Sequence, residues 1–388
     1  MGSAARRGGS SGRTGRSAFP DRRGADISGN NNGGKLTVSG VVNESDNVAG
    51  WYLGEGDAVS GELRIDGETQ ASGNILGGYT EKGGALANSV MIDGSSVRPA
   101  ENEAGEELAP PLIVGGGSAD GDASDNRVTV TGGDMNLPDD LPGHLEDMSD
   151  ISGTVNAQAA IIAGGIVGVT ADESGQAEAA GAARDNTVIL AGEADVSGAE
   201  LYGWRAEDGT TEVQETSGNT LVIDNWSGSV KKAQNFDAVR FDSVTWEDGG
   251  TVLEATDGED AMLADAEILA DDLVIRGENT PQAGERMTFI RGTEASAGEQ
   301  EGPLSFTKGT VTRGTAVMEQ ETAGSLDYVI QTVGLNPQTA AVNRGRLTGA
   351  AFVNQGGGHR GGRGEPSRRR ISLGHAHLRR GLWQPERI

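Results

Sequence analysis

Three aspartates, Asp120, Asp122 and Asp125, lie close together in a loop of Gly, Ser and Ala. Carboxylates at such spacing are ligands that Ca²⁺ accepts. The loop has neither the central Gly nor the distal Glu of an EF-hand, and no tandem nonapeptides surround it. We therefore interpret it as one of the solvated acidic loops that an acidic chain is expected to contain.

The histidines offer little for catalysis or metal binding. Of the four, only His144 lies outside the C-terminal tail, where His359, His375 and His377 are found. His144 follows the Pro-rich loop 137–143, and we expect it to be a solvated side chain rather than a member of a Ser–His–Asp triad. The pair His375 and His377 supplies two ligands, fewer than a metal site needs.

Two short strings match catalytic motifs without their structural context. Gly8-Gly9-Ser10-Ser11-Gly12 has the letters of a nucleophile elbow and Gly356–Gly361 those of a dinucleotide fingerprint, but neither lies between a strand and a helix. Glycoside cleavage needs two carboxylates at a fixed separation, and 58 acidic residues single out no pair. We predict a protein that is not an enzyme, with no catalytic, cofactor or metal site.

Charge is unevenly distributed along the chain. The net charge is −27, yet residues 1–23 carry +5 and residues 359–388 carry +6. Residues 24–358 hold 17 basic and 55 acidic side chains and therefore carry −38. Such a body repels nucleic acid and anionic membranes, so we expect no nucleic-acid partner. Cys is absent, which excludes disulfides, and the longest apolar run, 159–169, is too short to span a membrane.

A bipartite repeat begins after residue 24. Its first half is an apolar pair followed by Gly, as in Ile75-Leu76-Gly77-Gly78, Ile113-Val114-Gly115-Gly116, Ile162-Ala163-Gly164-Gly165 and Leu201-Tyr202-Gly203-Trp204. Its second half is Asn followed by alternating apolar residues, as in Asn88–Ile92, Asn126–Val130, Asn186–Leu190 and Asn219–Ile223. Residues 36–40 and 63–67 match the second half without its Asn.

This pattern predicts short strands with one buried face, joined by tight corners at Gly and Asn. Asn in such corners can also stack on Asn of the next repeat. An isolated hairpin of this size is marginal in water, whereas stacked repeats bury a continuous core. We therefore predict an all-β fold, a right-handed parallel β-helix (solenoid), ahead of a β-sandwich. Val90, Ile92, Val128, Val130, Val188, Leu190, Leu221 and Ile223 should share one interior.

Beyond Asn225 the motif fades while strands continue. Phe236, Val239, Phe241, Val244 and Trp246 are spaced like further repeats. Residues 262–275 fit either a helix or strands. Further strands are expected at residues 287–290, 304–306, 310–312 and 328–333. Asn336-Pro337 then resembles an N-cap and first helical position, so a helix is expected to begin there.

At this segment the chain resembles a known family. Leu335-Asn336-Pro337-Gln338-Thr339, with Gly345-Arg346 and residues 350–356, is similar to the linker of bacterial autotransporter outer-membrane proteins (type V secretion), and the repeats are similar to their passengers. The resemblance covers about residues 24–356. It implies a β-helix passenger displayed at the bacterial cell surface or released, joined by a linker helix to an outer-membrane β-barrel.

The resemblance leads to four segments: a disordered basic tail (1–23), a β-helix passenger (24–334), a linker helix (335–356) and an Arg-rich disordered tail (357–388). We expect a truncated reading frame, since neither signal peptide nor barrel can be recognised and residues 357–388 suit an out-of-frame translation. The implied function is adhesion or self-association, with host or neighbouring-cell surface ligands or further copies as partners. A polysaccharide-acting enzyme and a structural stalk are the alternatives.

Overall fold

The computed structural model describes two units of the chain, Met1–Asn336 and Pro337–Ile388, in part. The described residues are 31–39, 48–67, 70–72, 74–98, 111–135, 160–171, 177–207, 216–257, 262–295, 302–322, 324–337, 339, 341, 344, 346 and 347. The expected tails, the loop with His144 and the two Gly-rich strings all lie outside them. Among the described residues no helix is both long and apolar enough to cross a membrane.

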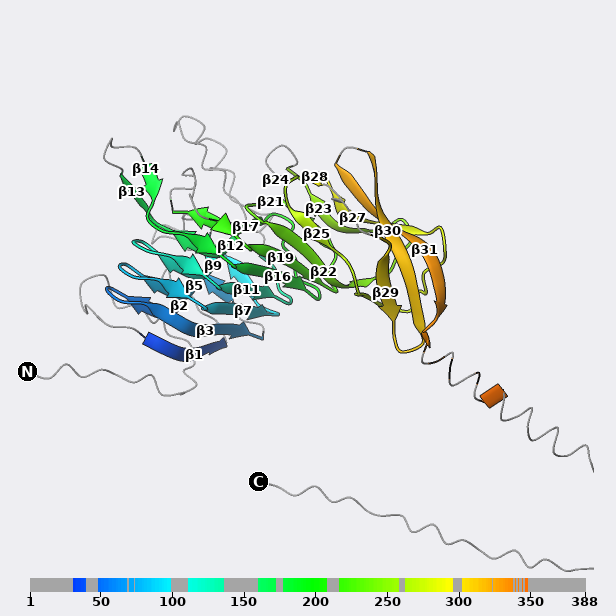
Figure 1. Ribbon diagram of the computed structural model, residues 1–388. Coiled ribbons are helices and arrows are strands. Elements are labelled where there is room, and N and C mark those ends of the chain that lie inside the picture. Colours follow the sequence, from blue (N-terminus) through cyan, green and yellow to red (C-terminus); the bar gives the residue numbers. More distant parts are fainter. Residues whose placement is uncertain are drawn as a thin grey trace, which may run out of the picture. The chain divides into compact units, whose positions relative to one another are not determined.

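Strands dominate the first unit, and Figure 1 shows them stacked largely in chain order. Nineteen described strands form one long sheet: β1 (Asn31–Ser39), β3 (Ala58–Asp66), β6 (Ala85–Leu86), β7 (Ser89–Asp93), β10 (Ala123–Ser124), β11 (Arg127–Val130), β15 (Ala183–Arg184), β16 (Thr187–Ala191), β18 (Thr216–Ser217), β19 (Thr220–Asp224), β20 (Gly228–Val230), β22 (Ala238–Thr245), β23 (Thr251–Ala255), β25 (Glu267–Leu269), β26 (Leu273–Arg276), β27 (Arg286–Arg291), β29 (Leu304–Lys308), β30 (Thr312–Thr322) and β31 (Ser325–Leu335).

A second sheet is parallel throughout. Its six described strands are β2 (Val48–Leu53), β5 (Ile75–Thr80), β9 (Leu112–Ser118), β12 (Ile161–Val167), β17 (Glu200–Ala206) and β21 (Lys232–Gln234). The remaining pairs are β4 (Gln70–Ser72) with β8 (Ser96–Arg98), β13 (Val169–Ala171) with β14 (Ala177–Ala179), and β24 (Met262–Leu263) with β28 (Glu294–Ala295). The predicted all-β class is confirmed, and long parallel sheets are its main feature.

Each repeat contributes strands to both sheets. The first half of the motif forms a strand of the six-stranded sheet, and the second half forms strands of the long sheet, as β9 and β11 do. Equivalent residues pair in register: Val90 lies beside Val128 and Val128 beside Val188. The eight residues predicted to share an interior are all buried in one cluster, which confirms that prediction. Each such side chain contributes about 1.5–3 kcal/mol by leaving water.

The Asn of each repeat forms a ladder inside the protein. The side-chain oxygen of Asn126 accepts hydrogen bonds from the backbone N–H and the side-chain amide of Asn88, at 3.0 and 3.1 Å. The Asn126 amide donates to the carbonyl of Ala85 and to the side-chain oxygen of Asn186. Asn186 and Asn219 continue the pattern. The predicted stacking of Asn is confirmed, and it satisfies buried backbone groups.

The left-handed corner lies one residue earlier than the Asn. Ala87, Asp125 and Asp185 have φ angles of 53°, 57° and 55°. The expectation that Asn itself adopts the left-handed conformation is therefore wrong for the ladder residues. Their side chains are held inside by hydrogen bonds, while the preceding side chain turns outward.

The glycine pairs of the motif make room for this ladder. A Cβ on Gly116 would lie 2.1 Å from the side-chain oxygen of Asn126, and one on Gly78 would lie 2.4 Å from that of Asn88. A Cβ on Gly115 would lie 2.6 Å from the carbonyl oxygen of Gly164. Distances below about 3 Å are not tolerated, so the two halves of the motif are packed against each other within each repeat.

At the N-terminal end the large and the small residue of this contact change places. Gly34 and Gly61 occupy the Asn position, and Trp51 pairs with Gly78 in the six-stranded sheet. The indole of Trp51 lies over both glycines, where a Cβ would come within 2.3 and 2.6 Å of the ring. A large side chain thus fills the space in which the Asn ladder is absent.

The C-terminal end of the first unit changes to antiparallel pairing. β27 pairs with β31, β29 with β30, and β30 with β31, all antiparallel. Aromatic rings fill the core: Phe289 packs 4.6 Å from Phe241 and 4.7 Å from Tyr328, measured between ring centroids. The expected strands at 287–290, 304–306 and 328–333 are confirmed.

Three other expectations for this region are resolved. Residues 262–275 contain β24, β25 and β26, so the helical alternative is wrong. The strand expected at 310–312 is also wrong, because residues 309–311 form a turn and β30 begins at Thr312. In the second unit the described residues 337, 339, 341, 344, 346 and 347 are helical.

Candidate functional site

The outer face of the six-stranded sheet carries a second apolar cluster. Val114, Ala163 and Tyr202 pair in register across β9, β12 and β17, and with Leu76 they pack apart from the main core. These residues are the second members of the apolar pairs in the motif. Neighbouring side chains on a strand point to opposite faces, so only the first member of each pair enters the main core.

Two further columns of side chains flank this cluster. Leu112, Ile161, Glu200 and Lys232 pair along one side, and Tyr52, Tyr79, Gly117, Ile166 and Arg205 pair along the other. The rings of Tyr52 and Tyr79 stack with centroids 5.5 Å apart, and the ring of Tyr79 leaves no room for a Cβ on Gly117. The outer face is therefore aromatic and aliphatic over most strands and charged at β17 and β21.

The charged end is a compact network around Glu200. The Nζ atoms of Lys231 and Lys232 lie 3.1 and 3.3 Å from the two carboxylate oxygens. The hydroxyl of Tyr202 donates to the same carboxylate at 2.9 Å. The side chains are well shielded, with 12% of Glu200 and 16% of Lys232 exposed. Shielding makes these interactions stronger than those of surface ion pairs.

The network shifts the pKa values of its members. Burial by itself would raise the pKa of Glu200, but hydrogen bonds from Tyr202 and Lys231 and the charge of Lys232 hold it below its usual range. Burial raises the pKa of Tyr202, and the Glu200 carboxylate raises it further. Burial would lower the pKa of Lys232, but its contacts with Tyr202 and Glu200 outweigh that and raise it. At neutral pH the network thus holds a carboxylate, a protonated phenol and an ammonium group.

Arg205 lies beside this network but takes no part in its ion pairs. Its guanidinium carbon is 5.7 Å from the centroid of the Tyr202 ring, and the Nζ atom of Lys232 is 5.6 Å from the same centroid. The Nε atom of Arg205 is buried and has no hydrogen-bond partner. Among the described residues, Arg205 forms no ion pair.

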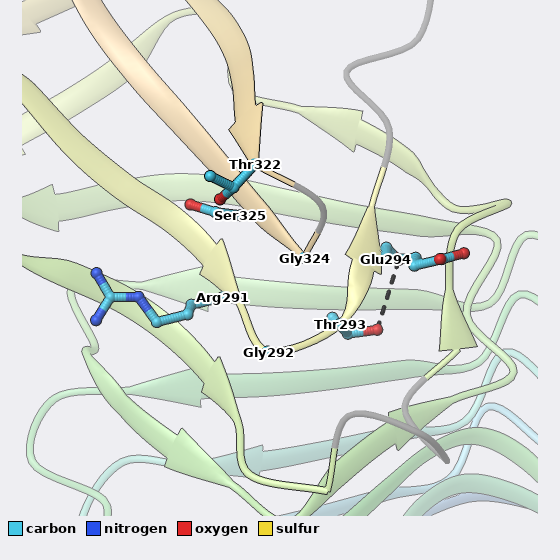
Figure 2. A pocket seen from close by; sticks show the side chains of 7 residues that line it. All are labelled: Arg291, Gly292, Thr293, Glu294, Thr322, Gly324 and Ser325. Atoms are coloured by element: carbon cyan, nitrogen blue, oxygen red, sulfur yellow. Dashed lines mark hydrogen bonds between the residues drawn. The ribbon is translucent and has the colours of Figure 1, made fainter.

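One hollow lies elsewhere, at the turn between β30 and β31 (Figure 2). It has a volume of about 620 Å³ and is wide open to solvent. Its lining is mostly backbone and small polar side chains: Arg291, Gly292, Thr293, Glu294, Thr322, Gly324 and Ser325. Arg291 and Glu294 are exposed, so we place the candidate site on the outer sheet face instead.

A second hollow, of about 440 Å³, brings three carboxylates near Trp246. Glu285 accepts hydrogen bonds from the Trp246 indole at 3.1 Å and from the backbone of Gln282. Asp248 accepts one from the backbone of Arg286. Two of the three carboxylates, Glu285 and Asp248, are therefore engaged in holding the chain together, and Glu278 is exposed.

The described residues include the acidic loop that was considered as a calcium site. Asp120, Asp122 and Asp125 are exposed, and the Asp122 carboxylate accepts a hydrogen bond from the backbone of Ala182 in the next repeat. Asp125 occupies a left-handed corner. No group of three His, Asp or Glu close enough to hold a metal is present among the described residues.

Sequence reasoning missed the outer sheet face. One signal was available: two consecutive apolar residues on a strand point to opposite faces, so the pair in each motif implied an outward apolar column. The network of Glu200 with Lys231 and Lys232 had no such signal, because its members are about thirty residues apart. No family model matches the chain, and neither characterised proteins nor solved structures show a significant similarity to it.

Proposed function

We propose that this chain is an autotransporter passenger, a right-handed parallel β-helix exported to the cell surface or beyond. Support comes from the linker-like segment at residues 335–356 and from repeats that pair in parallel register across 27 to 60 residues of sequence. Crossovers between parallel strands are almost always right-handed, which favours that hand for the helix.

The proposed role is non-enzymatic binding, either adhesion to other surfaces or self-association. The observation that carries it is the outer face of the six-stranded sheet, where apolar and aromatic side chains form aligned columns on β2, β5, β9, β12 and β17. The centre of this face is buried, since Val114, Ala163, Ile166 and Tyr202 are at most 7% exposed. The part of it that can contact another surface is therefore the stacked pair of Tyr52 and Tyr79. A plain structural stalk has no need of such a face.

Self-association can be tested by light scattering of the full chain between pH 4 and pH 8, with and without calcium. The acidic body repels its own copies, so association is expected when acid titrates the carboxylates or calcium screens them. Replacing Tyr52 and Tyr79 by Ser should reduce it, because both rings lie on the outer face.

Arg240→Gln is the matched control, since Arg240 is exposed on the long sheet and pairs locally with Asp242. It should leave association unchanged. If association is the same at every pH, with and without calcium, and after both Tyr residues are replaced, the proposed role of this face is contradicted.

A polysaccharide-acting enzyme is the second candidate. It is favoured by the shifted pKa values of Glu200, Tyr202 and Lys232, because such groups gather at catalytic sites. Against it, both oxygens of Glu200 are already engaged by Lys231, Lys232 and Tyr202. Cleavage of a polysaccharide by the full chain that is lost in Glu200→Gln would establish this candidate in place of the binding role.

A further inference from the structure

The last strand of the first unit, β31, has an edge that is only partly paired. Its residues 325–329 pair with β27, and the backbone of Ile330 donates to Glu285 and accepts from Gly284. Beyond Ile330 no described residue pairs with this edge, although β31 continues to Leu335 and pairs with β30 on its other side. Residues 331–335 thus form an open edge, defined here as the β31 edge, at the β30–β31 end of the stack in Figure 1.

The β31 edge presents regular backbone groups. The register shift between Thr315 and Ala316 lies before it, and the N–H of Asn336 donates to the carbonyl of Val311 on β30. Because the backbone groups of neighbouring residues in a strand point to opposite edges, those of Val333 and Leu335 point to the open side. Natural sheets often protect such edges with charged side chains or Pro, and residues 331–335 contain neither.

Apolar side chains accompany this edge. Val311, Val333 and Leu335 are 47%, 36% and 54% exposed. Val333 pairs with Gly314, and Gly314 pairs with Phe306, whose ring occupies the space beside the glycine. Val333 therefore continues the side of the sheet on which Phe306 is buried, past the end of the core. Covering these side chains would remove apolar surface from water.

The β31 edge is also free of charge in a strongly acidic body. Residues 24–358 carry −38, so two copies of the chain repel each other in most orientations. Residues 331–335 are Gln, Thr, Val, Gly and Leu, and a contact made through them places no carboxylate directly opposite another. A charged peptide would find no ionic partner among these five side chains, which favours an uncharged partner strand.

We propose that the β31 edge pairs with the β31 edge of a second copy, antiparallel and about a two-fold axis at Val333. Identical edges match each other in this arrangement, and it closes after two copies. Val333 then lies opposite the second copy's Val333, and Leu335 lies opposite Gln331. The contact joins the long sheets of two copies and does not involve the outer face of the six-stranded sheet, so it goes beyond the proposed adhesive role.

The first experiment measures the mass of the full chain by sedimentation at neutral pH without calcium. Salt at about 0.15 M screens charges that are more than about 8 Å apart, so the acidic bodies can approach. Five residues from each copy bury far less than a standard protein interface, so the dimer should be weak and should dissociate on dilution. A monomer–dimer equilibrium is expected.

A pair of charge variants tests the two-fold axis. Val333→Lys places two ammonium groups opposite each other and Val333→Asp places two carboxylates, so each should weaken the dimer at least about 10-fold. An equal mixture of the two variants should regain it, because opposite charges then face each other. Val274→Lys is the matched control, since Val274 is 39% exposed on β26, and it should dimerise like the unchanged chain.

A cross-link provides a second readout. The chain has no Cys, so Val333→Cys introduces a single thiol. Residues that face each other in an antiparallel pair have Cα atoms about 5.5 Å apart, which a disulfide can span. Mild oxidation should give a covalent dimer of Val333→Cys and leave Val274→Cys mostly monomeric. Circular dichroism of each variant establishes that it folds.

The proposal is overturned if the chain is monomeric at every concentration, if the mixed charge variants associate no better than each alone, or if both Cys variants cross-link equally. Slow amide exchange at Val333 and Leu335 in a monomer would mean that the edge is covered within one chain, and would also overturn it. Replacing Tyr52 and Tyr79 by Ser should leave this dimer intact. Association promoted by acid or calcium that persists in Val333→Lys would support the outer face independently.

Discussion

At the scale of single residues, the Asn ladder explains how a polar side chain becomes part of an apolar interior. Each Asn both accepts and donates, so its amide passes a hydrogen bond from one repeat to the next. The ladder ends on Asp237, whose carboxylate accepts from the backbone and side-chain amide of Asn219. An acceptor-only group is suited to the last position, because nothing further along needs a donor from it.

This direction of hydrogen bonding predicts that exchanges between Asn and Asp have different effects inside the ladder and at its end. Asn126→Asp removes the donor to Ala85 and Asn186 and buries a charge, so the free energy of unfolding should fall by at least about 3 kcal/mol. Asp237→Asn, at the exposed end, should cost less than about 1.5 kcal/mol. Urea unfolding measures both. Equal losses would mean that the ladder has no direction.

At the scale of elements, each repeat is specified by the contact between its two halves. Strands such as β9 carry Gly where the Asn of the following segment needs space, as Gly116 does for Asn126. At the N-terminal end the large side chain is Trp51 in the six-stranded sheet, and the positions that face it are Gly34 and Gly61. From β3 to β19 the spacing between repeats varies from 27 to 60 residues without changing the register, because insertions leave these contacts intact.

Adding one methyl group should therefore matter at one glycine and not at another. Gly116→Ala places a Cβ against the Asn126 amide and should lower the free energy of unfolding by about 1–3 kcal/mol, whereas Gly334→Ala meets no atom within 4 Å and should be neutral. Combining Gly116→Ala with Asn126→Gly should cost less than the sum of the two single changes. Simple additivity in thermal unfolding would refute the contact.

At the scale of the whole first unit, the two ends have different cores. The repeats from β3 to β16 are filled by Val, Ile, Leu and Ala, while β22, β27 and β31 bury Phe241, Phe289 and Tyr328 in one aromatic stack. Aromatic side chains bury more area and gain from ring contacts. Parallel repeats contact only their neighbours, so stability need not be uniform along the stack.

Hydrogen exchange should show this difference directly. Amides of β1 and β3 should exchange before those of β22, β27 and β31. Phe289→Ala should lower protection at the aromatic end by about 3–5 kcal/mol and leave β1 and β3 nearly unchanged, because no contact reaches that far. Uniform protection along the chain, or an equal loss at both ends, would show that the unit unfolds as one cooperative block.

The sequence by itself determined the local features of this protein. Alternating apolar residues after Asn88, Asn126 and Asn186 indicated strands and a shared interior, because alternation and strand geometry have the same period of two. Repetition of one motif also indicated that Asn stacks on Asn. These are properties of a few neighbouring residues, which a linear pattern contains in full.

Only the tertiary structure decided which residues meet across repeats. It turned Leu76, Val114 and Tyr202 to an outer face, and it placed Glu200 beside Lys231 and Lys232. It also turned β30 and β31 into an antiparallel end. The physical reason is that such contacts depend on register between segments separated by tens of residues, and insertions of varying length remove any fixed spacing from which that register could be derived.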